Sequence, residues 1–241
     1  MARALARGWG DPVLVTDGGS GAAARLAAEV GGQALDSNAE LAERADVVVL
    51  CHKPAQLEAV SREVGDRASP IVSVLGAVPV ARLQEAYPDS EVLRTMPNTA
   101  VEVGQGVTCL CRGSGQAPEA LDVIRALFER VGTVVELPEH LMDVASATAG
   151  VAPAYVALVV EAQIDAAIKH GLPGALAGRL VIESLAGSAS LLRARDSDTL
   201  TVRREVTSPG GSTARGLAAL ERGGLRSAFG DAFEAVLGGG R

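Results

Sequence analysis

Aromatic side chains are scarce in this 241-residue chain, where only 2% of the residues are Phe, Tyr or Trp. So few rings leave no stacking platform of the kind on which single-stranded nucleic acid is bound. The formal net charge of -7 also disfavours a protein that binds a phosphate backbone. We therefore expect no nucleic-acid partner, and a core built mainly from Ala, Val and Leu.

Cysteine is also rare, with three residues at 51, 109 and 111. This small odd number argues against a disulfide scaffold and favours a reducing compartment. The three histidines are scattered at 52, 140 and 170, so Cys109 and Cys111 are expected to be buried thiols and not metal ligands. No apolar run reaches about 18 residues, and the N-terminus lacks a recognisable export signal. These absences predict a cytoplasmic protein with no bound metal and no membrane partner.

The first half of the chain alternates short apolar runs with segments of helical periodicity. Strands are predicted at 13–16, 47–50, 71–74, 91–94, 106–111 and 132–137, and helices at 2–8, 22–30, 41–44 and 119–130. Apolar strands separated by helices are typical of βαβ units. We therefore predict an α/β domain with a parallel sheet that is covered on both faces.

The second half changes character near residue 137, beyond which no strand is predicted. Helical periodicity covers 153–170, 173–195, 213–221 and 226–237. The two longest segments are rich in Ala and contain Gly174, Gly178 and Gly187, so their helices can approach closely. A helical domain of roughly 100 residues with few aromatics is marginal alone. We expect its apolar faces to be buried in a homodimer or a larger assembly.

Several polar residues directly follow the predicted strands. Ligands of doubly wound sheets bind outside the carboxyl ends of strands, so Lys53 either faces a nucleotide or is a solvated loop lysine. Asn98 follows Pro97 and offers an amide, although an ordinary turn also uses Pro-Asn. Asp17 ends a strand where an acidic residue can hold a ribose, or it forms a turn.

The segment from Thr207 to Thr213, Thr-Ser-Pro-Gly-Gly-Ser-Thr, precedes a predicted helix. Its glycines allow close approach of the backbone, and N–H groups at a helix start attract anions. A simple N-cap needs one hydroxyl residue and not the whole stretch. This segment therefore predicts an anion site.

Together these segments resemble the pyrroline-5-carboxylate reductase family along nearly the whole chain. The family motifs occur here in the family's order: 46–50 with Lys53-Pro54, Met96-Pro97-Asn98-Thr99, Pro153-Ala154-Tyr155, 206–213, Gly216-Leu217 and 223–226. The resemblance implies an N-terminal Rossmann-like nucleotide-binding domain at 1–136 and an all-α dimerisation and substrate domain at 137–241. It implies reduction of 1-pyrroline-5-carboxylate to L-proline, the last step of proline biosynthesis, with NADPH or NADH.

The resemblance also assigns roles to individual residues. Thr213 would be catalytic, approaching the ring nitrogen of the substrate. The implied substrate contacts are Glu139, Ser208, Gly210, Gly211, Ser212 and Thr213. The implied cofactor contacts are Asp17, Asn38, Lys53, Pro54, Gly76, Met96 and Asn98.

Four features depart from the family pattern. The family's first strand and Gly-x-Gly-Asn-Met segment are absent before Ala2, which is expected to weaken the cofactor site. A start codon assigned too late or a trimmed chain explains this absence, and a non-catalytic relative is the other explanation. Ala149–Ala152 lack two family hydroxyls, Gly76-Ala77 inverts the family's Ala-Gly, and Glu205 adds charge near the anion loop.

Two alternatives to the reductase stay open: a catalytically silent dimeric homologue, and a reductase of the same fold that acts on another imine or keto substrate. The choice of cofactor is also open. Asp17 favours NADH, whereas Ser20 and Arg25 would receive the additional phosphate of NADPH.

Overall fold

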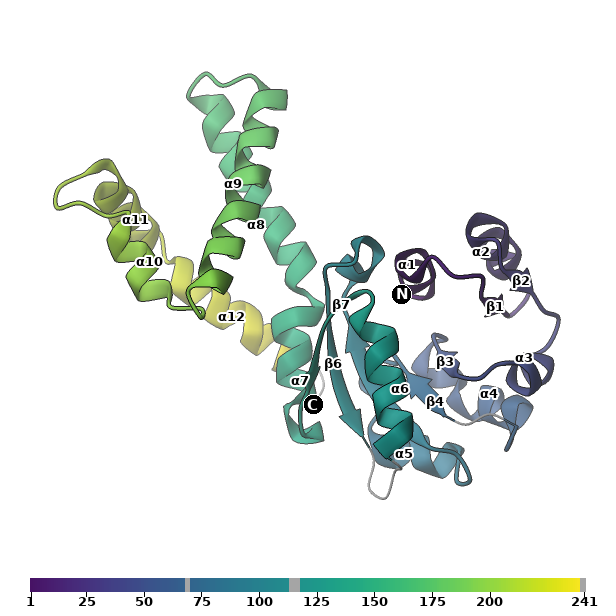
Figure 1. Cartoon of the computed structure of the whole chain (residues 1–241). Helices are drawn as coiled ribbons and strands as arrows, with labels where there is room; N and C mark the ends of the chain where they lie inside the picture. Colours follow the sequence, from purple (N-terminus) through teal and green to yellow (C-terminus); the bar gives the residue numbers. More distant parts are fainter. Residues whose placement is uncertain (68–69, 113–117, 239–241) are drawn as a thin grey trace. The chain divides into compact units, whose positions relative to one another are not determined.

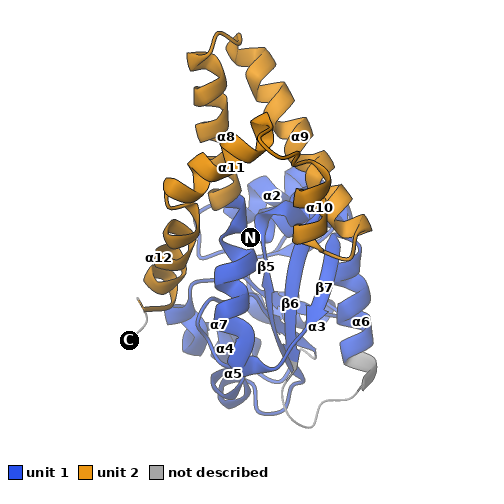
Figure 2. Cartoon of the chain, turned by 90° about the vertical axis from the view of Figure 1, so that its left-hand side faces the viewer, with its two compact units in different colours: residues 1–153 blue, residues 154–241 orange. Residues whose placement is uncertain are grey.

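The computed structural model describes residues 1–67, 70–112 and 118–238. The chain divides into two compact units, residues 1–153 and 154–241 (Figure 2). The domain boundary predicted at residue 137 stays a prediction. Met142 and Ala147, which follow that point, belong to the N-terminal unit and are buried there with at most 1% of their surface exposed.

The N-terminal unit alternates strands and helices in the predicted way (Figure 1). All six predicted strands are present, whereas β2, α4 and α5 were not predicted. The elements are α1 (Ala2–Trp9), β1 (Leu14–Val15), α2 (Ala22–Val30), β2 (Gln33–Ala34), α3 (Asn38–Arg44), β3 (Val48–Leu50), η1 (Pro54–Gln56), α4 (Leu57–Val64), β4 (Ile71–Ser73), α5 (Val80–Ala86), β5 (Val92–Pro97), η2 (Thr99–Val103), β6 (Gly106–Arg112), α6 (Pro118–Glu129), β7 (Gly132–Glu136), η3 (Glu139–Leu141), α7 (Met142–Ala145) and the π-helical turn η4 (Ser146–Gly150).

The main sheet has five strands in the order β3-β4-β5-β6-β7. The predicted parallel sheet is confirmed in β3, β4 and β5 and again between β6 and β7, but β6 runs antiparallel to β5. Only the short η2 separates β5 from β6, so the chain reverses without the crossover that a parallel pair requires. β1 and β2 form a separate parallel pair in which Leu14 lies opposite Gln33.

Both faces of the main sheet are covered, as expected from its apolar strands. Ile71 belongs to a cluster with residues of α3, α4 and α5, whereas the next residue, Val72, packs with α1, η2 and α6 on the opposite face. This alternation follows from the two-residue period of a strand. The carboxyl ends of β3, β4 and β5 therefore project from a covered sheet at one edge.

The C-terminal unit is entirely helical in its described part, as predicted. Its elements are α8 (Ala152–Lys169), α9 (Gly174–Ala194), α10 (Thr199–Glu205), α11 (Ser212–Arg222) and α12 (Leu225–Gly238) (Figure 1). Gly174 and Gly178 of α9 face Ile168 and Ile164 of α8, and a Cβ atom at either glycine would be in ordinary contact with Cδ1 of the isoleucine at 3.6 and 3.8 Å.

This helical unit leaves much of its apolar surface uncovered within one chain. Ala177 is its only buried residue among those described, and Leu158 is 65% exposed. Two helical stretches, Glu139–Lys169 and Gly174–Ala194, are long and apolar enough to cross a membrane by length and composition. The same apolar surface is what a second protein copy would cover.

Candidate active site

The predicted cofactor residues lie at the carboxyl ends of strands in the N-terminal unit. Lys53 follows β3, Gly76 follows β4, and Asn98 follows β5. These three strands are parallel neighbours, so their following loops share one edge of the main sheet. Asp17 follows β1 of the two-stranded sheet.

Asp17 closes the loop that leads into α2. Its carboxylate accepts hydrogen bonds from the backbone N–H groups of Gly19, Ser20 and Ala23 at 2.7–3.1 Å and from the Ser20 hydroxyl at 3.0 Å. The bond from Ala23 is the main cause that lowers the pKa of Asp17 to about 2. The structure therefore shows the turn-forming role of Asp17, and its contact with a ribose stays a prediction.

Asn38 links the end of β1 to α4. The Thr16 hydroxyl donates to Oδ1 of Asn38 at 2.6 Å, and Nδ2 of Asn38 donates to Glu63 at 2.6 Å. Each end of the amide thus has one protein partner and keeps capacity for one more. This arrangement allows the cofactor contact predicted for Asn38, which stays a prediction.

The loop after β3 holds an unusual histidine that the sequence analysis passed over. Nδ1 of His52 donates to the carbonyl oxygen of Lys53 at 2.9 Å, and Nε2 is buried with no hydrogen-bond partner in the described part of the chain. Lys53 and Pro54 are exposed beside it. Desolvation raises the pKa of the neighbouring Cys51 to about 11, so this thiol stays protonated at neutral pH.

The backbone of the loop after β4 is open to a ligand at Gly76. A Cβ atom at Gly76 would meet nothing within 4 Å, so a flat ligand has room to approach there. The next residue, Ala77, has a φ of 58°, in the left-handed region that disfavours residues with a side chain. Strained backbone of this kind is found preferentially at functional sites.

The loop after β5 is fixed by Asn98. This residue is 7% exposed, and its side chain donates to the Ala149 carbonyl at 3.1 Å and accepts from the Val107 N–H at 3.2 Å. Asn98 therefore ties the loop after β5 to the π-helical turn that carries Ala149. Met96, half-buried at the end of β5, packs beside the same turn. Cofactor contacts of Met96 and Asn98 stay predictions.

Glu139, predicted to lie beside the substrate, is held within the N-terminal unit. Its Oε1 accepts from the Val80 N–H at 2.6 Å and from the Arg94 guanidinium at 3.2 Å. Arg94 also binds Asp143 at 3.2 Å and is 4% exposed. The sequence analysis missed this buried arginine, although one charge within an otherwise apolar strand is a visible signal. The predicted substrate contact of Glu139 stays a prediction.

The Ser-Pro-Gly-Gly segment forms a tight turn into α11. The Gly211 N–H donates to the Ser208 carbonyl at 3.0 Å, and Gly210 has a φ of 68° as the second central residue of the turn. A Cβ atom on Gly211 would lie 2.4 Å from Oγ of Ser208 and 3.1 Å from its carbonyl oxygen, so a larger residue there would displace the Ser208 hydroxyl. Arg215 donates to the Gly210 carbonyl at 2.7 Å and holds the turn against the helix.

The first turn of α11 is an open set of donors. The N–H groups of Ser212, Thr213 and Ala214 have no acceptor in the part of the chain that the structure describes, and the two hydroxyls are exposed. Free N–H groups at a helix start bind anions. The charge of Glu205, expected to oppose an anion, is paired with Arg195 at 3.3 Å.

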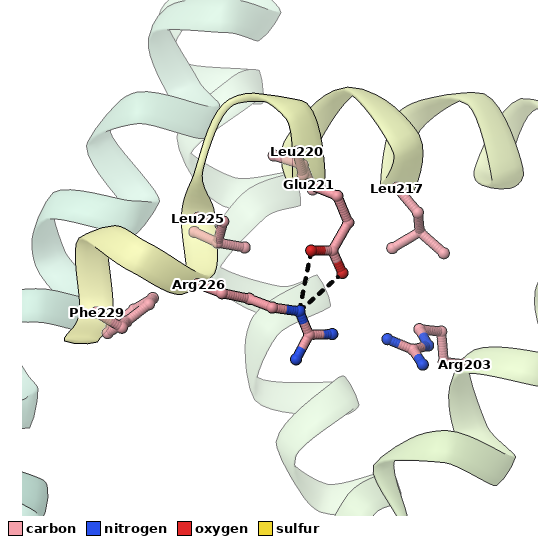
Figure 3. Close-up of a pocket in the computed structure, with 7 residues that line it drawn as sticks. All are labelled: Arg203, Leu217, Leu220, Glu221, Leu225, Arg226 and Phe229. Atoms are coloured by element: carbon pink, nitrogen blue, oxygen red, sulfur yellow. Dashed lines mark hydrogen bonds and ion pairs between the residues drawn. The ribbon is translucent and has the colours of Figure 1, made fainter.

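A separate apolar cavity of about 470 Å³ lies among α10, α11 and α12 (Figure 3). Leu217, Leu220, Leu225 and Phe229 line it, and Arg226 on its rim is paired with Glu221 at 2.9 Å. Its wall is apolar and lies on the exposed face of the helical unit, which is typical of an interface and not of a site for a charged substrate.

The residues present fit a nicotinamide cofactor. The backbone beside Gly76 is open, His52 offers an unsatisfied buried nitrogen, and Lys53 adds a free cation among the described residues at the same sheet edge. The described residues that would hold the cofactor therefore lie in the loops after β3 and β4.

Two family models match the chain. Residues 1–76 match "NADP oxidoreductase coenzyme F420-dependent", and residues 139–239 match "Pyrroline-5-carboxylate reductase dimerisation". With the fold, these matches define a nicotinamide-dependent oxidoreductase that has a Rossmann-like domain and a helical dimerisation domain.

The pyrroline-5-carboxylate reductase of Synechocystis is 38% identical over 201 residues, which are 83% of this chain and 75% of the relative. The Thermus thermophilus enzyme is 39% identical over 194 residues, covering 80% and 73%. The chain belongs to the pyrroline-5-carboxylate reductase family.

Solved structures agree with this assignment. The Plasmodium falciparum pyrroline carboxylate reductase with NADP bound has a TM-score of 0.86 at 27% identity, covering 97% of this chain and 90% of that chain. The Coxiella burnetii enzyme has a TM-score of 0.87 at 28% identity, covering 98% and 92%. The predicted family and the predicted fold, a Rossmann-like domain followed by a helical dimerisation domain, are confirmed.

Proposed function

We propose that this protein reduces the C=N bond of 1-pyrroline-5-carboxylate to give L-proline, with NAD(P)H as the reductant. The observation that carries the proposal is the open first turn of α11, where three backbone N–H groups lack an acceptor among the described residues and two hydroxyl side chains are exposed. An anionic substrate with a polar group next to its carboxylate suits this set of donors. When bound, the cofactor supplies a hydride to the imine carbon.

The turn from Ser208 to Gly211 positions the donors for the substrate carboxylate. The left-handed Gly210 and the crowded Gly211 fix the direction in which the N–H groups of Ser212 and Thr213 point. The described first turn of α11 contains no acidic residue to compete with an anion. These donors would therefore meet a carboxylate without competition from a neighbouring acidic side chain.

Thr213 is proposed to act on the ring nitrogen. Its hydroxyl lies in the same helical turn as the carboxylate donors, and in the substrate the nitrogen is attached to the carbon that bears the carboxylate. Hydride addition at the imine carbon leaves an electron pair on nitrogen, which binds a proton. A hydroxyl placed there can donate to the nitrogen and relay that proton, an effect worth about 10²–10⁴ in rate.

NADPH is proposed as the preferred reductant. The Asp17 oxygens are directed at N–H groups of their own loop, so the carboxylate is partly neutralised. The exposed Arg25 guanidinium contacts only the Ser20 carbonyl, at 3.4 Å, and pairs with no carboxylate in the described residues. A free guanidinium beside this strand end favours a phosphate on the ribose. Replacement by Ala in R25A is expected to lower kcat/KM for NADPH more than for NADH.

The assembly is proposed to be a homodimer formed by the C-terminal unit. The exposed face of α8, which carries Leu158, and the apolar wall of the α10–α12 cavity are two apolar areas that one chain leaves uncovered. A second copy would bury this surface. A cytoplasmic location and the absence of nucleic-acid and membrane partners stay predictions.

A substrate panel tests the proposed reaction. Oxidation of NADPH is followed with 1-pyrroline-5-carboxylate, with other cyclic imines and with 2-keto acids, each at matched concentrations. The proposal expects kcat/KM to be highest for 1-pyrroline-5-carboxylate. Higher values for another imine or keto acid would assign a different substrate to the same fold, and no turnover of any compound would indicate a catalytically silent homologue.

A further inference from the structure

The Glu139 carboxylate holds the start of α5 from a distant part of the chain. Its Oε1 accepts the N–H of Val80, the first residue of α5, at 2.6 Å. The N-cap of that helix is Pro79, which has no side-chain hydrogen bond, and the described first turn contains no acidic residue. Glu139 therefore supplies the anion that stabilises the helix start, a role that a neighbouring residue usually fills.

Arg94 fixes this carboxylate from the side of the sheet. Its guanidinium binds Oε1 of Glu139 at 3.2 Å and Asp143 at 3.2 Å, and only 5% of its side chain is exposed. A buried cation with two anionic partners has few alternative positions. The Glu139 oxygen is thereby held where the Val80 N–H can reach it.

The segment tied down in this way is the loop from Leu75 to Pro79. Its first end is fixed by the Leu75 N–H, which donates to the Ser73 hydroxyl at 3.2 Å. Its far end is fixed by the bond from Val80 to Glu139. Between them lie the open backbone of Gly76 and the left-handed Ala77. Strained backbone persists only where its surroundings hold it.

We infer that Glu139 is a positioning residue, which acts through the Val80 N–H to hold the Leu75–Pro79 loop in the shape that receives the nicotinamide cofactor. This inference rests on the proposed function, which places the cofactor beside Gly76. It replaces direct contact with the substrate as the role of Glu139. Loss of Glu139 is therefore expected to weaken the affinity for NADPH, whereas the proton relay depends on Thr213.

Hydrogen exchange tests the structural part without any cofactor. In Glu139→Ala the amide of Val80 is expected to exchange about ten-fold faster or more, the size of effect expected for one lost charge-assisted hydrogen bond. Glu139→Gln keeps an acceptor oxygen, so the exchange rate of the Val80 amide is expected to stay close to that of the unmodified protein. Asp143→Ala is the matched control, because it removes the other carboxylate from Arg94 and leaves the Val80 bond intact. Unchanged exchange in Glu139→Ala would overturn the inference.

Titration with NADPH and steady-state kinetics test the functional part. Glu139→Ala is expected to raise Kd and KM for NADPH several-fold with kcat nearly unchanged. Val80→Pro removes the donor at the first helical position, where the backbone tolerates proline, and is expected to give the same rise in Kd and KM for NADPH. Because the Val80 side chain is buried in the core, Val80→Ala, which keeps the N–H, is the control for the lost side chain. Adding Glu139→Ala to Val80→Pro is expected to raise Kd for NADPH little further, because the bond between Val80 and Glu139 is already absent. Unlike Val80→Pro alone, the double variant also loses the pairing of Glu139 with Arg94, and Asp143→Ala is the control for losing a partner of Arg94.

Three outcomes would contradict the role inferred for Glu139 or decide it in another way. A raised KM for the imine with unchanged affinity for NADPH would show that Glu139 contacts the substrate. If Glu139→Ala fails to fold, Val80→Pro and Glu139→Gln decide the question, and unchanged NADPH affinity in Val80→Pro overturns the inference. If no NADPH binds even to the unmodified protein, the proposed function and the functional part fail together, while hydrogen exchange still shows whether Glu139 holds the helix.

Discussion

The carboxylate of Asp17 accepts the backbone N–H of Ala23 at 2.7 Å and so caps α2 from six residues upstream. This bond makes stability depend on pH. The pKa of Asp17 is about 2 in the folded protein against 3.8 for the free side chain. Because the folded value is lower, the stabilisation is complete above about pH 4 and is lost as the pH falls through about 2.

Replacement of Asp17 by Ala is therefore expected to lower Tm at pH 7 and to have almost no effect at pH 2. Melting curves of both proteins across this range provide the measurement. Asp36→Ala is the control, since Asp36 is exposed and makes no hydrogen bond within the described residues. A loss of Tm that is the same at pH 2 and pH 7 would mean that the carboxylate does not cap the helix.

Ala77→Gly is expected to stabilise the protein by about 1 kcal/mol, because glycine adopts the left-handed conformation without steric cost. Gly76→Ala is the matched control on the adjacent residue, where open space and the absence of a left-handed φ predict a gain of about 0.5 kcal/mol or no change. Urea denaturation measures both. A destabilised Ala77→Gly would show that the Ala77 methyl group makes a contact worth more than the strain.

Thr213→Ala is expected to lower kcat about 100-fold or more and to change the KM of the imine little, since the backbone donors of α11 remain. Thr213→Ser keeps the hydroxyl and is expected to retain most of the activity. Steady-state kinetics and a melting curve on the same sample separate catalysis from folding. Unchanged turnover with a lowered Tm would reduce Thr213 to a helix-capping residue.

Leu158→Asp is expected to convert the dimer into monomers, because it places a charge on the exposed apolar face of α8. Val103→Asp is the control, a similar change at a residue of the N-terminal unit that is 73% exposed. Sedimentation velocity at micromolar concentration gives the mass of each species. A stable folded monomer of the unmodified protein would refute the assembly.

The sequence predicted elements whose pattern is local. The β-branched run of β3 and the apolar spacing of α2 mark a strand and a helix without further context. β2 escaped prediction because Gln33 and Ala34 have neither apolar alternation nor strand propensity, and they form a strand only by pairing with β1. The antiparallel direction of β6 also depends on pairing, which no periodicity records.

In the candidate site too, the local features could be predicted from the sequence, whereas the contacts between distant residues could not. The Ser208–Gly211 turn and its donors follow from residue types whose backbone demands are local. The bonds of Glu139 to Val80 and Arg94 span 59 and 45 residues, so no spacing rule indicates them. Asp17 was predicted as an acidic residue at a strand end, but its bonds to the N–H groups of its own loop depend on the folded path of the chain and follow no sequence pattern.

Isotope transfer tests the reductase assignment most directly. The protein is incubated with 1-pyrroline-5-carboxylate and NADPH that carries deuterium at both C4 positions of the nicotinamide, and the product is analysed by mass spectrometry and NMR. The account predicts L-proline with one deuterium at C5, the ring carbon that was the imine carbon, and a rate at least 100-fold lower in Thr213→Ala. Proline without deuterium, or no proline from a folded protein that binds NADPH, would contradict it.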